Sequence, residues 1–242
     1  MSRWRLVSYS LWQARDFAID RGIAILLIGF LWGYAFILPV RSTMAYEITN
    51  RASPVWTFTL QISSAIVSVA VLIAVNGIVS IDRKTGYYRF LFAKPVNPIL
   101  YYTQIFFVYM AGVMACMFVL SRILQTILPT FSIVNYMLYT ALIYLAMGGI
   151  GFFLSVATRY DWLSLAAVWL GARILRTTFG DGNDWRSKAV QLLPPVHKLD
   201  EVSNSLIGTG TANSNDVLWL LGYGTLFLVL GLVLLRKGSL AD

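Results

Sequence analysis

The stretch NGIVSIDRKTGYYRFLFAKPVNPIL, Asn76–Leu100, separates two long apolar runs of this 242-residue chain. It is short, basic and amphipathic, and prolines close it. Each flanking run is long enough to cross a bilayer as a helix, which needs roughly 20 residues. A loop of this kind at a membrane face is typical of a docking element for a soluble partner. The stretch therefore predicts a membrane protein that is driven from outside its own chain.

The composition supports this class. Hydrophobic residues make up 58% of the chain and charged residues only 12%, whereas about a quarter of an ordinary soluble protein is charged. Six apolar segments occur, at 22–40, 55–81, 99–125, 134–157, 162–178 and 216–235. Lipid cannot pair with backbone polar groups, so such runs form helices or barrel strands, and the runs do not alternate as barrel strands would. The sequence therefore predicts an all-α integral membrane protein with six transmembrane helices in one domain, residues 1–242.

The distribution of basic residues predicts the orientation. With the N-terminus in the cytoplasm, the inner segments hold 11 Lys and Arg residues, the outer segments hold 5, and the other three of the 19 lie inside predicted spans. Basic residues are enriched in cytoplasmic loops. We therefore expect both termini in the cytoplasm. The expected location of the chain is a bacterial cytoplasmic (inner) membrane. The net charge of +8 follows largely from this bias and calls for no nucleic-acid partner.

Residues 1–21 precede the first apolar run and have a pattern of their own. Apolar residues, among them Trp4 and Trp12, recur three to four positions apart, with Arg5 and Arg15 between them. Helices with a basic amphipathic pattern lie in the membrane interface, with the apolar face against lipid. The segment therefore predicts an interfacial elbow helix that contacts membrane lipids. The alternative is that its charges only orient the first span.

Two groups of polar residues inside the predicted spans are candidates for a translocation path. Gln61, Ser64 and Ser68 share one helical stripe, and Arg173 and Arg176 share one face of the short fifth span. Polar side chains in a membrane avoid lipid, so they line a hydrated path or contact other helices. Helix packing is the alternative for the first group. For the two arginines, the alternative is that they reach the outer interface.

The absence of familiar catalytic motifs predicts a chain without enzymatic activity. No phosphate-binding GxxxxGK[ST] loop and no GxSxG nucleophile motif occurs. The chain has one cysteine, Cys116, which excludes a cysteine cluster, and one histidine, His197. We therefore expect neither a metal site nor a cofactor on this chain. The polar segment 179–215 is predicted to lie outside the cytoplasm, with short helices that re-enter the membrane around Pro194-Pro195.

Three stretches carry a family resemblance: LWQARDFAIDRG at 11–22, SIDRKTGYYRFLFAKPVNPILYYTQI at 80–105, and LLPPVHKLDEVSNSLIG at 192–208. They are similar to the charged elbow, the loop after the second span and the proline-containing outer segment of ABC-2 (type V) transporter permease subunits. Together with the six-span plan, the resemblance covers nearly the whole chain. Lys84 and Tyr87 depart from the family pattern, in which a second acid and a threonine are common.

The resemblance implies that the loop 82–98 forms a cytoplasmic coupling helix between spans 2 and 3, seated on a separate ABC ATP-binding subunit. The coupling residues that it assigns are Asp82, Arg83, Lys84, Thr85, Gly86, Tyr87, Arg89, Phe90 and Leu91. ATP and Mg would bind to that subunit, and a second permease, in a homodimer or a related heterodimer, would complete the path. The implied function is ATP-driven export of an unspecified cargo. The alternative is a non-transporting membrane scaffold or assembly factor.

Overall fold

The computed structural model describes residues 3–33, 54–86, 97–127, 131–158, 161–179 and 196–238, and all of its regular elements are helical. The elements, of which η1 and η3 are π-helical, are α1 (Arg3–Phe17), η1 (Ala18–Gly22), α2 (Ile23–Trp32), α5 (Pro54–Val75), α6 (Ser80–Lys84), α8 (Pro98–Ile127), α9 (Ile133–Ala157), α10 (Asp161–Phe179), α12 (Val196–Ser203), η3 (Asn204–Thr209) and α13 (Ser214–Gly238). The prediction of an all-helical protein is confirmed for the described residues.

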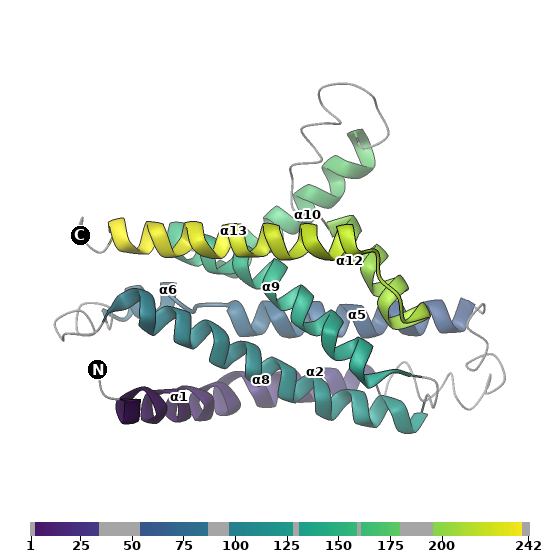
Figure 1. Cartoon of the computed structure of the whole chain (residues 1–242), viewed down its shortest axis with the longest axis horizontal. Helices are drawn as coiled ribbons and strands as arrows, with labels where there is room; N and C mark the ends of the chain where they lie inside the picture. The colour runs from purple at the N-terminus through teal and green to yellow at the C-terminus, as the bar shows by residue number, and fades with distance from the viewer. Residues whose placement is uncertain are drawn as a thin grey trace.

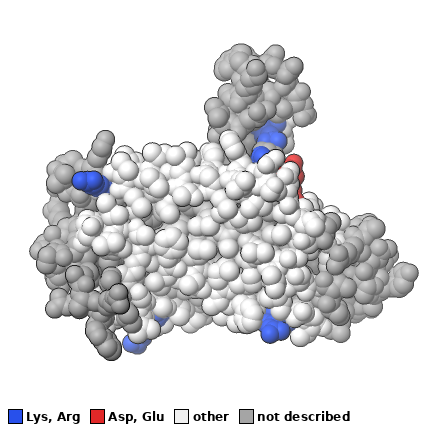
Figure 2. Space-filling model, in the orientation of Figure 1, with Lys and Arg blue, Asp and Glu red and all other residues white. Residues whose placement is uncertain are grey.

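Four helical segments in the described part of the chain are long and apolar enough to cross a membrane: Trp56–Asp82, Pro98–Thr126, Ile133–Ala157 and Ser214–Arg236. They correspond to the second, third, fourth and sixth predicted spans. They indicate an integral membrane protein, in agreement with Figure 2, where the broad middle of the visible face carries no charged residue. The first predicted span continues beyond residue 33 into undescribed residues. Helix α10 is not one of the four, because Arg173 and Arg176 interrupt its apolar run.

The ends of the helices gather in a defined way (Figure 1). Helix α1 begins and α13 ends at the same end of the bundle, where α6 also lies. We call this end, defined by Arg3, α6 and Gly238, the terminal end. Helices α12 and η3 lie at the opposite end, and α10 leaves the bundle at a steep angle to α13. The start of α1, the end of α13 and the short helix α6 are therefore on one side of the bundle.

The N-terminal helix does not turn away from the bundle as an elbow would. Helices α1, η1 and α2 follow one another without a break and run parallel to α8 (Figure 1). The Ser10 hydroxyl lies 2.6 Å from the Gln104 amide nitrogen, and the Phe17 ring lies 5.1 Å from the Tyr109 ring. Farther along, Gly29 faces Leu120. The apolar face expected to contact lipid is therefore partly used to pack against α8.

Helix α9 holds the bundle together from its centre. The Tyr136 hydroxyl donates to the Ser63 carbonyl on α5 at 3.2 Å, and the Tyr144 hydroxyl donates to the Phe106 carbonyl on α8 at 2.9 Å. Both tyrosines are fully buried. A buried tyrosine supplies a large apolar surface and a polar group that needs a partner. These side chains therefore join α9 to two neighbouring helices.

Helices α9 and α13 approach each other so closely that their backbones touch. A Cβ added to Gly149 would overlap the carbonyl group of Gly224, and one added to Gly224 would overlap backbone atoms of Leu145 and Ala146. Small residues permit such contact between helix backbones in a membrane. Gly231, which follows Gly224 on α13, contacts Phe152, which follows Gly149 on α9. Residue numbers therefore increase in the same direction along both helices, and α9 and α13 run parallel. The end of α9 and the start of α13 therefore lie at opposite ends of the bundle.

Replacing Gly224 with Ala should lower the thermal unfolding midpoint, because the backbone atoms that the new Cβ would overlap cannot move aside. Overpacking of this kind costs about 1–3 kcal/mol. Gly222→Ala is the matched control on the same helix, since a Cβ there meets no atom within 4 Å. Fluorescence-detected size-exclusion chromatography of heated detergent samples measures both midpoints. Equal midpoints would contradict the close contact between α9 and α13.

Candidate functional site

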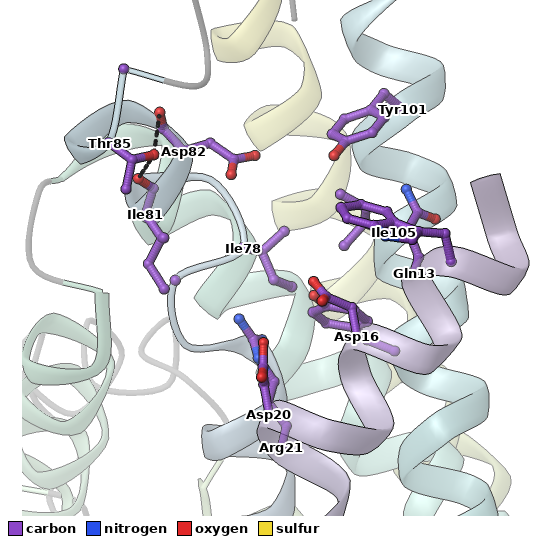
Figure 3. Close-up of a pocket in the computed structure, with 14 residues that line it drawn as sticks. Gln13, Asp16, Asp20, Arg21, Ile78, Ile81, Asp82, Thr85, Tyr101 and Ile105 are labelled. Atoms are coloured by element: carbon purple, nitrogen blue, oxygen red, sulfur yellow. Dashed lines mark hydrogen bonds between the residues drawn. The ribbon is translucent and has the colours of Figure 1, made fainter.

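A cleft of about 560 Å³ opens at the terminal end, between the N-terminal helix, the α5–α6 turn and the start of α8 (Figure 3). The residues that line it are Trp12, Gln13, Asp16, Asp20, Arg21, Gly77, Ile78, Ile81, Asp82, Thr85, Gly86, Tyr101, Ile105 and Tyr109. We call it the acidic cleft, because three of these residues are aspartates and only one is basic. Its polar groups come from three separate segments of the sequence.

The aspartates face one another across the acidic cleft. Asp16 and Asp20 extend from the N-terminal helix, and Asp82 extends from α6 on the other side (Figure 3). A carboxylate oxygen of Asp82 accepts a hydrogen bond of 3.0 Å from the Tyr102 hydroxyl. Asp16 and Asp82 are partly buried, whereas Asp20 is exposed. The cleft thus presents carboxylate oxygens from two walls.

Arg21 is the basic residue of the acidic cleft, and its position is determined by α5 and α8. Its guanidinium donates a hydrogen bond to the Ala74 carbonyl in the last turn of α5. Carbonyls in the last turn of a helix have no partner within the helix, so a guanidinium is well suited to them. The same group lies 4.6 Å from the centre of the Tyr109 ring on α8, within the range of a cation–π interaction. Arg21 therefore joins three helices.

Helix α6 is held in place by a serine from α9. The buried Ser155 hydroxyl oxygen accepts hydrogen bonds from the backbone N–H groups of Val79 at 3.1 Å and Ser80 at 3.4 Å. These N–H groups begin the short helix and would otherwise lack helical partners. Glycines with positive φ lie on both sides, Gly77 at +77° before α6 and Gly86 at +73° after it. The chain can therefore leave α5, form α6 and turn again within a few residues.

The predicted coupling residues fall into three groups. Asp82, Thr85 and Gly86 line the acidic cleft. Arg83 and Lys84 belong to α6, but their side chains lie outside the described part. The other four predicted coupling residues lie outside the described residues altogether: Tyr87, Arg89, Phe90 and Leu91. The structure therefore describes the beginning of the loop 82–98, and that beginning lies at the terminal end.

The residues predicted to line a path are placed elsewhere, and none of them lines the acidic cleft. On α5, the Ser64 and Ser68 hydroxyls donate to the carbonyls of Gln61 at 2.9 Å and Ser64 at 3.1 Å, within their own helix. The Gln61 side chain is exposed and the two serines are half-buried. Arg176 is half-buried on α10, which leaves the bundle, and the Arg173 side chain lies outside the described part. The two groups therefore lie on separate elements, and their role in a path stays a prediction.

Sequence reasoning missed one wall of the acidic cleft. The sequence predicts an interfacial helix for the segment that holds Gln13, Asp16 and Asp20, and it gives Arg21 a role only in orientation. Their spacing of three and four residues puts the first three on one helical face. That spacing was the available signal. It was ambiguous, because a polar stripe on an interfacial helix would look the same.

In the described part of the chain, no three His, Cys, Asp or Glu side chains lie close enough together to hold a metal ion. Comparison with protein-family models, with curated proteins and with solved structures gave no match for this chain. What the site can do therefore follows from its own geometry.

Replacing Ser155 with Ala should loosen α6, because the N–H groups of Val79 and Ser80 would lose their acceptor. Loss of a capping hydroxyl costs about 1 kcal/mol, which corresponds to roughly fivefold faster amide exchange around α6. Ser121→Ala is the matched control, since this buried hydroxyl bonds only the Phe118 carbonyl of its own helix. Hydrogen–deuterium exchange with mass spectrometry measures both. Unchanged exchange around α6 in Ser155→Ala would show that α9 does not hold it.

Proposed function

We propose that this chain is the transmembrane permease subunit of an ATP-driven ABC exporter, coupled through the loop 82–98 to a separate ATP-binding subunit. The observation that carries the proposal is the position of α6 and Gly86 at the terminal end, together with both ends of the chain. The excess of basic residues in these segments favours a cytoplasmic position for that end. A cytoplasmic ATP-binding subunit could reach a docking loop only there.

The attachment of α6 to its neighbours supports a role in coupling. Ser155 links the start of α6 to α9, and Tyr102 links Asp82 to α8. A displacement of α6 would therefore act on two spans directly. ATP binding on the partner can shift the bundle between two states only if contacts at the docking loop differ between those states. In this proposal, ATP and Mg bind to the partner subunit, and α6 with Gly86 transmits the change.

The proposed architecture has six spans. Because α9 and α13 run in the same direction, a returning segment is needed between them. Helix α10 has 19 residues, which at 1.5 Å each is about 28 Å and close to the thickness of the hydrocarbon core. In this proposal residues 22–40 form the first span, and α10 forms the fifth by lying along the bundle, whereas the structure places it at a steep angle to α13 (Figure 1). A second permease chain would enclose the path with this one, and Gln61, Ser64, Ser68, Arg173 and Arg176 remain the proposed lining.

Replacing Gly86 with Ala should reduce ATP hydrolysis by the complex several-fold. A Cβ at Gly86 meets no atom within 4 Å, so the substitution acts only on the backbone. Its φ of +73° costs a residue with a side chain about 1–2 kcal/mol. The turn that presents the docking loop would therefore change shape.

The measurement uses proteoliposomes containing this chain and an ABC ATP-binding subunit that copurifies with it. Gly222→Ala is the control, because that exposed glycine also has open space around it but lies in α13 without a positive φ. Its hydrolysis rate should match the unmodified complex. A Gly86→Ala complex that hydrolyses ATP at the unmodified rate would count against coupling through this turn.

A further inference from the structure

We infer that the acidic cleft is a binding site for a small organic cation, an ammonium or guanidinium group on a short apolar stem. The cleft shares Asp82, Thr85 and Gly86 with the docking loop, but the inference does not depend on the docking role proposed above. Three features carry the inference: a buried amide without a partner, an excess of carboxylates, and apolar walls.

Gln13 gives the first and most specific indication. Its side chain is only 2% exposed, yet neither its amide nitrogen nor its amide oxygen has a hydrogen-bond partner among the described residues. Buried polar groups in proteins are nearly always hydrogen-bonded, because water is lost without compensation otherwise. Gln13 lines the acidic cleft, and Figure 3 shows its amide on the side where Tyr101 and Ile105 lie. A ligand with N–H donors would satisfy the amide oxygen.

The charge of the cleft determines the sign of the ligand. Asp16, Asp20 and Asp82 contribute three carboxylates, against one guanidinium from Arg21. The guanidinium is already engaged by the Ala74 carbonyl and the Tyr109 ring. Among the described lining residues the carboxylates therefore exceed the cations by two, and they face the cleft from both walls (Figure 3). A cation that donates several hydrogen bonds fits this arrangement.

The size and walls of the cleft favour an organic cation over a metal ion. Its volume of about 560 Å³ lies within the range of small-molecule sites. Trp12, Ile78 and Ile105 supply apolar surface beside the carboxylates. The described acidic residues do not come together closely enough for metal coordination. An apolar stem would therefore contact these walls while the charged group reaches the aspartates and Gln13.

Two sources could supply this chemistry at the end of a membrane bundle: a soluble amine or guanidine, and the amino headgroup of a lipid. The full-length chain would be placed in nanodiscs of phosphatidylcholine, whose headgroup has no N–H donor. Calorimetric titration with butylguanidinium should show saturable binding. Butylurea, a neutral molecule of similar shape, should not bind. No binding of butylguanidinium, or equal binding of the two probes, would overturn the inference.

Variants then locate the site. Asp16→Asn combined with Asp20→Asn should weaken butylguanidinium binding about tenfold, because charge-assisted hydrogen bonds become neutral. Glu201→Gln removes an exposed acid on α12 and serves as the matched control, with unchanged affinity expected. Equal affinity of the double variant and the control would overturn the assignment of the site.

Gln13→Met distinguishes a binding role from a structural defect. The apolar side chain removes an unpartnered buried amide, so the thermal unfolding midpoint of the free protein should rise. Binding of butylguanidinium should weaken in the same variant. A raised midpoint with unchanged binding would show that Gln13 does not contact the ligand and would overturn its assigned role.

Nanodiscs containing phosphatidylethanolamine distinguish the two sources. A lower apparent affinity for butylguanidinium there would identify the lipid amino group as a competing occupant of the same site. An unchanged affinity would assign the site to a soluble cation. Because the ATP-binding partner is absent from these measurements, their outcome is independent of whether the chain couples to one.

Discussion

Backbone polar groups cannot remain unpaired in lipid, and this constraint shapes the whole structure. It makes the long apolar runs helical, and helices in a membrane must then associate through close packing and side-chain hydrogen bonds. Helix α9 meets both needs. Gly149 lets α13 approach its backbone, while Tyr136 and Tyr144 donate to carbonyls of α5 and α8. The position of every other described span follows from contact with this helix or its neighbours.

The same constraint places the candidate site at the end of the bundle. Free N–H and C=O groups, charged side chains and tight turns can exist only where the helices end or are covered by protein. Ser155 therefore caps the start of α6, and Arg21 reaches the last turn of α5 at the Ala74 carbonyl. The acidic cleft and the start of the docking loop share this end, and Asp82 takes part in both. Binding in the cleft and docking at the loop would consequently act on the same short helix.

The candidate site was only partly predictable. The family resemblance singled out Asp82, Thr85 and Gly86 as coupling residues, and the loop that holds them stands out locally because it interrupts two apolar runs. Their place in a cleft was not predicted. Asp16 and Gln13 belong to a helix whose pattern suited the membrane interface equally well. The structure places that helix along α8, where packing of Phe17 against Gly112 turns one of its faces inward. That contact joins residues far apart in the sequence, so no local pattern could reveal it.

The sequence by itself determined the class of protein and the location of most spans, because hydropathy and helix length depend only on consecutive residues. The described helices agree with it over α5, α8, α9 and α13. The tertiary structure alone decided which polar side chains converge. Convergence depends on how each helix is rotated about its axis and on how far it is shifted along its neighbour, and both are set by packing between distant segments. An elbow at the interface and a wall of a cleft can thus share one sequence pattern.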